Sequence, residues 1–488
     1  MARPGDRDPV SRRAHLERGA LWLAAVGLVA LACEPDAGVG PAPTWPSEPP
    51  HPIPRVVASA VAPGPANALS AVVSARVLYA DSAAVRFGPA GTTLDSLTPA
   101  VLYAADSIVV PVLGLLPDSL YTLVMLAYRG DYTAVGDSLT FQTGPLPADL
   151  PSYVTAGPDP SPGYVVFAAG RYGIVIDNTG RVVWYRRFEY GAGLSFAAQP
   201  TGHYVARPLT PEPTDPPVWV ELDRLGNVTR TVDCTRGLVS RLHDLILAPD
   251  GSYWLTCDDT RTMDLFAMGG LANARVTGTA IQHVGADGQL LFSWTPFDHF
   301  DLADLPQGAR AGASVNWTHG NSLDLDADGN IVVSFRNLSE ITTIDTQTGD
   351  VLWRMGGLRN QFTFANTSAP AFSRQHGLRV TDAGRLLLLD NYGDSLDSRA
   401  ERYVFDADLR VASLLTSYGP SPAVTADLGG SAQDLPDGRT LVSFGTAGRV
   451  EEYAASGQVV WRIEGAPGYI FRAQRIRSLY APGVGLPR

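Results

Sequence analysis

The sequence predicts an all-β protein, a six-bladed β-propeller preceded by a small β-sandwich. Short apolar runs alternate with Asp-Gly and other turn signals along most of the 488 residues. These segments show no 3.6-residue apolar period, which excludes a helical solenoid. Beyond Pro151 the runs recur in pairs of units at roughly 50–60 residues, the length of a four-stranded propeller blade. Residues 151–488 therefore have room for about six blades.

The first 33 residues have the layout of a bacterial export signal. Arg12 and Arg13 precede an apolar run, Leu21–Ala32, which is too short to cross a bilayer as a permanent helix. The run ends in small residues before Cys33, as in a lipoprotein signal, and the paired arginines partly resemble a twin-arginine signal. We expect export to the periplasm or cell surface, with Cys33 lipidated and tethered to a bacterial membrane. Simple cleavage and release is the alternative.

A proline-rich linker and a small domain follow the signal. Residues 34–52 hold seven prolines, which predicts a semi-rigid spacer without packed structure. Residues 53–147 contain short alternating strands, which predict a β-sandwich; the strands are expected at Ala71–Val77, Ser107–Val110 and Tyr121–Leu126. The run Leu115–Tyr121, closing with Phe141–Thr143, resembles a fibronectin type III domain. That resemblance implies a spacer or docking module without chemistry.

Residues 151–488 contain two alternating repeat units. One is a glycine followed by an apolar strand with tryptophan, at Gly180–Trp184, Gly349–Trp353 and Gly457–Trp461. The other is an Asp-Gly or related turn before an apolar run, at residues 250–251, 328–329 and 437–438. Such turns need positive φ and connect the strands of hairpins. The alternation predicts the successive hairpins of propeller blades.

Charge and cysteine content limit the function. A net charge of −12 gives no reason to expect nucleic acid as a partner and argues against a general anion-attracting surface. Any anion site must therefore be formed by positive or hydrogen-bond-donating groups gathered at the site itself. Only Cys234 and Cys257 follow the predicted signal. In an oxidising compartment they are expected to pair as a disulfide, with two buried thiols as the alternative.

Three of the eight histidines recur at one place in the repeat. His243 and His376 each precede a turn glycine by eight residues, and His319 precedes its turn glycine by ten. Equivalent positions of successive blades are related by rotation about the propeller axis. The three imidazoles are therefore predicted to converge, which indicates a functional site rather than three separate structural residues.

Two chemistries suit three converging imidazoles. Neutral imidazoles could bind zinc or copper. Alternatively they could surround an oxyanion, with one acting as nucleophile and the others donating hydrogen bonds. Arg336, expected on the strand after the turn in the His319 blade, favours the oxyanion, because a guanidinium repels a metal cation but binds sulfate as a charged fork. We therefore predict no metal.

The residues around these positions resemble the bacterial arylsulfate sulfotransferases. The matching segments, in order, are His243-Asp244, Trp317–Ser322, Ser334–Arg336, Gln375-His376, Tyr469–Ile476 and Ser478–Tyr480. The resemblance implies a six-bladed propeller that moves a sulfuryl group from a phenolic sulfate ester to a phenolic acceptor without a nucleotide donor or other cofactor. A homodimer is among the assemblies we expect.

The resemblance also implies roles for individual residues. His376 matches the nucleophile, which would form a sulfohistidine intermediate and give ping-pong kinetics. His243 and His319 match sulfate-binding histidines, and a protonated form of either could pass a proton to the departing phenolate. Asn321 and Arg336 complete the pocket.

The match is imperfect, and two other functions stay open. The family often has a second histidine where this chain has Leu242, and Thr318 and Gly320 replace apolar neighbours of His319. These differences leave the donor and acceptor specificity open. One alternative is a non-catalytic propeller that binds ligands or partners. The other is a three-histidine metalloenzyme.

Overall fold

The computed structural model describes residues 52–103, 107–212, 215, 217–367, 371–392, 396–465 and 468–485. Within these residues the chain consists of β-strands joined by turns and short 3₁₀-helices, without an α-helix. The predicted signal, Cys33 and almost all of the predicted linker lie outside the described residues. No helix among the described residues is long and apolar enough to span a membrane.

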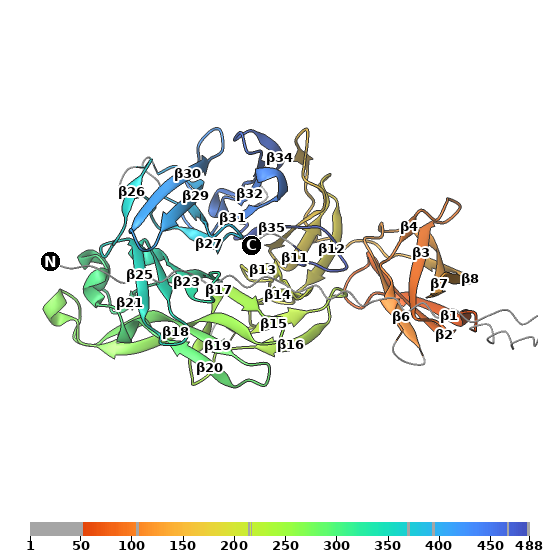
Figure 1. Cartoon of the computed structure of the whole chain (residues 1–488), viewed down its shortest axis with the longest axis horizontal. Coiled ribbons are helices and arrows are strands. Elements are labelled where there is room, and N and C mark those ends of the chain that lie inside the picture. Colours follow the sequence, from red (N-terminus) through yellow and green to blue (C-terminus); the bar gives the residue numbers. More distant parts are fainter. Residues whose placement is uncertain are drawn as a thin grey trace, which may run out of the picture. The chain divides into compact units, whose positions relative to one another are not determined.

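Two sheets form the N-terminal part (Figure 1). The first has the order β1–β2–β6, with β1 Arg55–Pro63, β2 Ser70–Leu78 and β6 Ile108–Leu113. The second has the order β4–β3–β7–β8 with β5 beside β3, and comprises β3 Ser82–Pro89, β4 Ser96–Leu97, β5 Val101–Leu102, β7 Leu120–Arg129 and β8 Tyr132–Gln142. One core of side chains from both sheets lies between them, including Val73, Val110 and Leu123, each 0% exposed.

These strands confirm the expected runs around residues 71–77, 107–110 and 121–126, because β2, β6 and β7 cover or overlap them. Alternating side chains of β2 point into the shared core, as the period of two predicts. The fibronectin type III identity and the domain boundary near residue 150 stay predictions.

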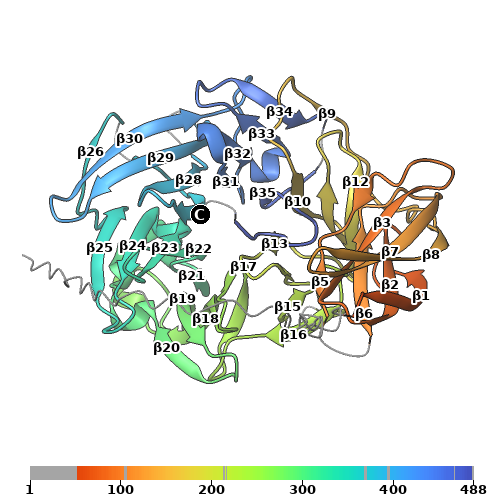
Figure 2. The ribbon, with the colours of Figure 1, turned by 45° about the vertical axis from the view of Figure 1, so that its right-hand side comes forward.

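From Thr155 onwards the described strands form six mainly antiparallel sheets. Figure 2 shows these sheets in a ring, with β13, β17, β22, β31 and β35 near its centre. In the order of each sheet the strands are β12 Val182–Arg187, β11 Tyr172–Ile176, β10 Tyr164–Ala169 and β35 Ala473–Ile476; β13 Phe196–Ala198, β14 Tyr204–Ala206, β15 Trp219–Leu222 and β16 Val228–Val232; β17 Val239–Leu247, β18 Tyr253–Met263, β19 Ala274–Val284 and β20 Leu290–Trp294, with β21 Ser314–Asn316 parallel to β19; β22 Gly320–Leu325, β23 Ile331–Phe335, β24 Glu340–Ile344 and β25 Val351–Gly356; β27 His376–Val380, β28 Leu386–Asp390, β29 Arg399–Asp406, β30 Val411–Tyr418 and the parallel β26 Thr363–Ala365; and β31 Ser431–Asp434, β32 Thr440–Ser443, β33 Val450–Tyr453, β34 Val459–Ile463 and β9 Thr155–Ala156. The arrangement is propeller-like.

The short 3₁₀-helices all lie in connections between strands. They are η1 Phe266–Met268, η2 Pro296–Asp298, η3 Leu302–Asp304, η4 Gln307–Arg310, η5 Arg336–Leu338, η6 Pro436–Gly438 and η7 Gly445–Ala447. Of these, η5 concerns the site directly, because it begins at Arg336.

The ring is closed by strands from its two ends. β35, near the C-terminus, pairs with β10 and supplies the innermost strand of the first sheet. β9, from the beginning of the ring, pairs with β34 in the last sheet. Strands distant in sequence therefore complete the first and last sheets.

The repeat units correspond to hairpins. Gly251 and Gly329 connect the first and second strands of their sheets with φ of +85° and +83°, conformations that favour glycine. The Gly–Trp units lead into the fourth strands of their sheets counted from the centre, where Trp184, Trp353 and Trp461 are buried. The structure thus confirms both units as hairpins of the sheets.

Polar side chains on or beside the inner strands join neighbouring sheets. Each accepts a hydrogen bond from a backbone N–H of the next inner strand. The pairs are Gln199 with Leu247 (3.0 Å), Asp244 with Leu323 (3.2 Å), Asp324 with Val380 (3.0 Å), Gln433 with Arg475 (2.6 Å) and Gln474 with Ala198 (2.9 Å). These contacts fix the register of the inner strands, which present the candidate site.

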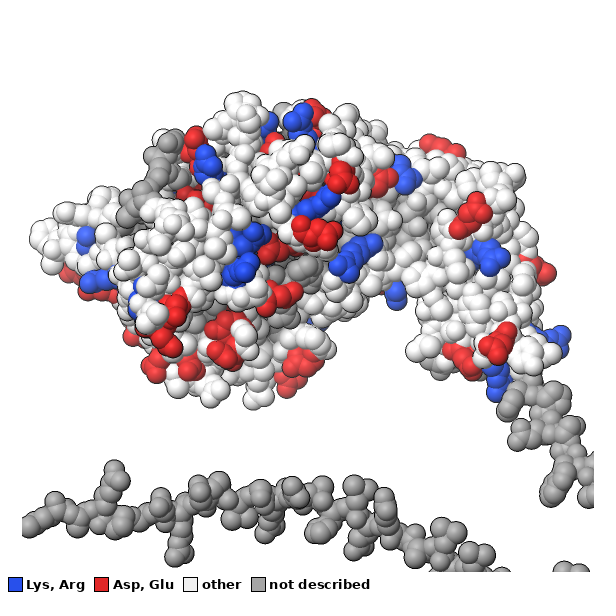
Figure 3. Space-filling view, turned by 45° about the horizontal axis from the view of Figure 1, so that its top comes forward, with Lys and Arg blue, Asp and Glu red and all other residues white. Residues whose placement is uncertain are grey.

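The sequence led us to expect a disulfide and no general anion-attracting surface, and the structure bears on both. Cys234 and Cys257 are joined by a disulfide, with their Cα atoms 6.1 Å apart. On the face drawn in Figure 3, acidic and basic side chains are interspersed among uncharged ones. Along the lower edge of the larger body in this view the charged side chains are mostly acidic.

Candidate active site

The structure brings the three predicted histidines together from three consecutive sheets. His243 lies within β17 at a register shift, His319 directly precedes β22, and His376 is the first residue of β27. The rings of His243 and His319 are 4.9 Å apart between centroids. Phe471 contacts the other side of the cluster, with its centroid 5.8 Å from His243 and 6.3 Å from His376. Two of the imidazoles are buried and His319 is half-buried.

A threonine on the preceding sheet holds the turn that presents His319. The Thr279 N–H donates to the Thr318 hydroxyl (2.8 Å), and the Gly320 N–H donates to the Thr279 hydroxyl (2.7 Å). A Cβ at residue 320 would lie 2.6 Å from Thr279 Cγ2, so only glycine fits. The residues at 318 and 320 that depart from the family pattern therefore form a local support for His319.

Neighbouring amides assign different proton positions to His319 and His376. Asn316 Nδ2 donates to His319 Nδ1 over 2.7 Å, which leaves the proton of the neutral ring on Nε2. His376 Nδ1 instead lies 2.8 Å from Asn391 Oδ1, which can only accept. His319 can thus donate a hydrogen bond through Nε2, whereas His376 has a lone pair there.

Burial keeps all three histidines neutral at pH 7. Desolvation is the main cause for each of them, and it lowers the pKa of His376 to about 4 and that of His319 to about 2. The pKa of His243 also falls well below its ordinary value, through burial and then the charge of Arg241. These pKa values do not support a protonated His243 or His319 as the group that passes a proton to the departing phenolate. The neutral rings can still donate hydrogen bonds.

Arg336 is a buried cation at this cluster, but it begins η5 instead of lying on β23 as expected. The chain turns there because β23 ends at Phe335. The guanidinium donates to the Asp427 carbonyl (3.2 Å) and the Asn337 side chain (3.1 Å), while its Nε has no partner among the described residues. Within the same residues the buried Nδ1 of His243 also lacks a partner. Unpaired buried groups of this kind need a partner such as an ordered water or a ligand.

Asn321 is fully buried and supports the site indirectly. Its Nδ2 donates to the Gln375 carbonyl over 2.7 Å, and its Oδ1 accepts from the Ser322 hydroxyl over 3.2 Å. The first contact fixes the backbone immediately before His376. The predicted role of Asn321 in contacting substrate stays a prediction.

Besides Arg336, which the sequence singled out, the site contains Arg241, Arg374, Phe471 and Asn391, which it did not. The charges of Arg241, Arg336 and Arg374 each lower the pKa of His319, after burial, so three guanidinium groups lie in its electrostatic neighbourhood. Phe471 and Asn391 contact the histidines directly. Arg241 and Arg374 each stand two residues before a site histidine in the sequence. A single arginine in a strand does not reveal whether its side chain points toward the site or toward solvent, so the sequence could not identify them.

A buried ion cluster lies next to the histidines. The Asp244 carboxylate accepts hydrogen bonds from Arg379 (2.9 Å) and Arg472 (2.7 Å). Although burial raises the pKa of Asp244, these two cations outweigh it and lower the pKa overall. Arg472 also donates to the His243 carbonyl over 3.4 Å. The cluster thus joins the strands that present His243 and His376.

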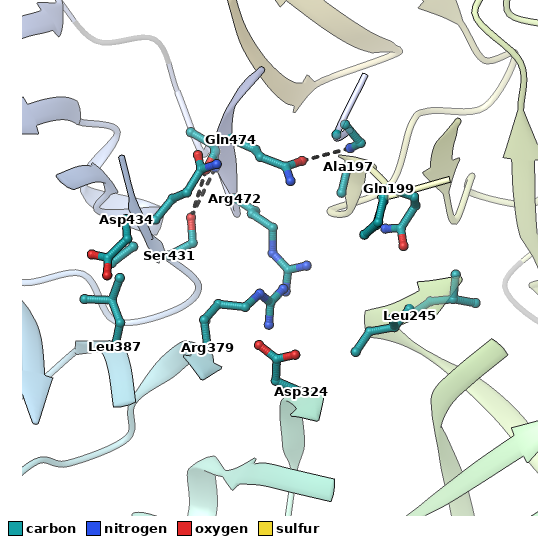
Figure 4. A pocket seen from close by; sticks show the side chains of 18 of the residues that line it. Ala197, Gln199, Leu245, Asp324, Arg379, Leu387, Ser431, Asp434, Arg472 and Gln474 are labelled. Atoms are coloured by element: carbon teal, nitrogen blue, oxygen red, sulfur yellow. Dashed lines mark hydrogen bonds between the residues drawn. The ribbon is translucent and has the colours of Figure 1, made fainter. Parts of the chain in front are cut away.

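A pocket of about 130 Å³ borders this ion cluster. Its walls include Leu245 and Ile246, and Arg379, Arg472 and Asp324 project toward its interior in Figure 4. None of the three site histidines lines it. The cavity is therefore distinct from the histidine cluster.

The arrangement defines an all-β, propeller-like protein with neutral histidines and guanidinium groups gathered at one place. Among the described residues, no three His, Cys, Asp or Glu side chains are placed to share a metal ion. A family model for arylsulfotransferase (ASST) matches residues 221–466, half of the chain. The chain belongs to this family.

More distant comparisons give weaker likenesses. No curated protein matches the chain. Among solved structures it is similar to a protein of unknown function from Bacteroides caccae, at 15% identity and a TM-score of 0.43 over 65% of this chain and 100% of that one. It is also similar to a streptogramin B lyase, at 13% identity and a TM-score of 0.37 over 65% of this chain and 85% of that one. A third similar structure is regucalcin, a calcium-binding protein from Agrobacterium tumefaciens, at 16% identity and a TM-score of 0.32 over 66% of this chain and 95% of that one. At these TM-scores the likenesses add nothing to the argument on function.

Proposed function

We propose that the protein is an aryl-sulfate sulfotransferase that uses His376 as nucleophile. The carrying observation is a buried, neutral His376 whose Nδ1 faces an acceptor, which assigns the lone pair to Nε2, with the charge of Arg336 near enough to lower its pKa. Membership in the arylsulfotransferase family supports this function over a non-catalytic propeller or a metalloenzyme. The six sheets then correspond to the six blades of the propeller.

The proposed reaction has two displacements at sulfur. Nε2 of His376 attacks the sulfur of a phenolic sulfate, the bond from sulfur to the aryl oxygen breaks, and a phenolate leaves with the bond electrons. The intermediate is a sulfohistidine, protonated at Nδ1. A second phenol then attacks the same sulfur, the S–N bond breaks, and the acceptor's proton passes to a neutral histidine such as His243.

The neighbouring groups would act mainly by electrostatic stabilisation. Charge on the transferring group spreads over its peripheral oxygens, so fixed donors lower the barrier. Arg336 Nε, the Nε2–H of His319 and an N–H of His243 are the donors we assign to these oxygens. Because the histidines are neutral, the arginine supplies the positive charge.

The first experiment uses purified protein with 4-nitrophenyl sulfate and excess phenol, with release of nitrophenolate followed by its colour. We expect turnover that requires the acceptor, a burst of nitrophenolate equal to the enzyme concentration without it, and neither in His376→Ala. Binding of aryl sulfates without a burst or turnover would instead support the non-catalytic propeller.

We also propose export and anchoring through lipidated Cys33, which the sequence of the first 33 residues supports. Expression in a bacterium with radiolabelled palmitate should label the wild-type protein in the membrane fraction and leave Cys33→Ala unlabelled. Label in both proteins, or in neither, would contradict lipidation at that residue.

A further inference from the structure

A buried amide contacts the ring of the proposed nucleophile, which also makes a hydrogen bond to the backbone of Arg374. Asn391 directly follows β28, is 0% exposed, and places Oδ1 2.8 Å from Nδ1 of His376. β27 and β28 are antiparallel neighbours, and their pairing brings the end of β28 beside the beginning of β27. The contact therefore follows from the blade itself.

Hydrogen bonds on the other end of the amide fix its orientation. Nδ2 of Asn391 donates to the carbonyl of Ala426 (2.6 Å) and to that of Gly429 (2.9 Å), which uses both of its hydrogens. With the amide reversed, Oδ1 would face two carbonyl oxygens and both donors would be lost. Oδ1 therefore faces His376, and the facing ring nitrogen must be the one with a hydrogen.

The loop that anchors Asn391 also holds the site arginine. Asp427 lies in the segment 426–429, and its carbonyl accepts from Arg336 over 3.2 Å. Its carboxylate accepts from the Tyr392 hydroxyl over 2.9 Å, one residue beyond Asn391. One short loop thus connects the amide beside the nucleophile with the guanidinium beside the anion position.

We propose that Asn391 is the positioning residue that sets the tautomer of His376, keeping its proton on Nδ1 and the lone pair on Nε2. The kinetic consequences of this assignment rest on the proposed function, whereas the tautomer does not. Without the Asn391 acceptor, the imidazole can hold its proton on Nε2, where the proton blocks attack on sulfur. The same Oδ1 would also stabilise the positive ring formed when Nε2 binds the sulfuryl group.

The direct test is ¹⁵N NMR of protein labelled at histidine, with the His376 signals assigned through His376→Gln. We expect a protonated Nδ1 and an unprotonated Nε2 in the wild type. Asn391→Leu, which keeps the size and removes the acceptor, should shift the ring to the Nε2–H form or a mixture. A wild-type ring protonated on Nε2, or an unchanged tautomer in Asn391→Leu, would overturn the proposal.

Kinetics separate this role from a structural one. In Asn391→Leu the burst rate constant with 4-nitrophenyl sulfate should fall by about 10²-fold to 10⁴-fold, the range from loss of a ring-orienting partner to loss of the correct tautomer, while KM changes little. Asn178→Leu is the matched control, because Asn178 also bridges segments through both ends of its amide but contacts no site histidine. Its burst should be normal. An equal loss in both variants would assign Asn391 to folding alone.

A second variant covers failure to fold. If Asn391→Leu does not fold, Asn391→Asp decides: the carboxylate still accepts from Nδ1, so the tautomer should persist and the histidine pKa should rise. An unchanged pKa there would contradict the contact. The tautomer and the activity can also give different answers. If the wild type has the expected tautomer, Asn391→Leu loses that tautomer, and the wild type transfers no sulfuryl group, then the proposed function fails and the positioning role stands.

Discussion

His376 combines the properties that a neutral nucleophile needs. It is 1% exposed and is held by an amide on one nitrogen. A buried imidazole avoids the charge that burial penalises, so the attacking form is already present at pH 7. Its neighbours therefore determine both the protonation state and the reactive atom.

The buried, neutral state of His376 predicts that the burst rate constant decreases only at a pH well below the ordinary histidine pKa. Burial lowers the pKa of His376 to about 4, so the ring is neutral above that pH and becomes protonated below it. We expect a burst rate constant that is flat from pH 6 to 8 and falls as the pH decreases through about 4. Stopped-flow release of nitrophenolate measures it. An acid limb near 6.5, the ordinary histidine value, would contradict the buried neutral state.

The glycine after the nucleophile is required by a close backbone approach. Gly377 has φ +63°, and a Cβ there would lie 2.7 Å from Ser431 Cα on the next inner strand. We expect Gly377→Ala to cost about 2 kcal/mol or more and to displace His376, with loss of the burst. Gly384→Ala is the matched control, since φ is +68° with no atom within 4 Å, and should cost about 1 kcal/mol. Denaturant unfolding compares them, and equal costs would exclude the close approach as the cause.

At the scale of the strands, two aspartates at similar positions of neighbouring inner strands differ in their charged neighbours. Asp244 and Asp324 each accept from the following residue's N–H and from the next inner strand. Of the two, Asp244 also accepts from two arginines, while burial raises the pKa of Asp324. Asp244 therefore neutralises the buried Arg472 and the half-buried Arg379, and the ionised form of Asp324 is less favoured.

Replacement of these carboxylates should separate the two roles. Asp244→Asn leaves Arg379 and Arg472 without their hydrogen-bonded counter-ion, which should cost about 3–5 kcal/mol of unfolding free energy. Asp324→Asn resembles the protonated acid and should cost about 1 kcal/mol. Midpoints of denaturant unfolding provide the comparison. A larger loss in Asp324→Asn would contradict the assignment of the ion cluster to Asp244.

Strand positions were predictable at this scale, but strand partners were not. The Gly–Trp and Asp-Gly units correctly marked the hairpins because glycine at positive φ and alternating apolar residues are local signals. The support of His319 by Thr279 depends on two residues in different sheets. Local patterns contain no information on such a pairing, so the departures at residues 318 and 320 had no explanation from sequence.

For the whole ring, closure depends on the last strand. β35 pairs with β10, and Gln474 and Arg475 make hydrogen bonds to the inner strands on either side. Removal of residues 473–488 should therefore leave the edge of β10 unpaired and abolish cooperative unfolding. Removal of residues 481–488, which keeps β35, is the control and should preserve it. Thermal unfolding followed by circular dichroism measures both. Equal transitions would show that the ring does not need β35.

The sequence by itself determined the all-β class, the hairpin repeat and the identity of the three histidines. These are local or periodic properties, since a turn glycine, an alternating strand and a histidine eight to ten residues before a turn can be recognised within a short segment. The same reasoning singled out Arg336 from its residue type and its place in the blade.

The tertiary structure alone decided the contacts that set the chemistry. Whether His376 is neutral depends on how deeply the surrounding sheets bury it, and its reactive nitrogen depends on Asn391, whose amide is oriented by Ala426 and Gly429. The arginines around Asp244 come from β27 and from the segment before β35. Burial and hydrogen bonding are properties of groups brought together from distant positions, so they exist only once the ring of sheets has closed.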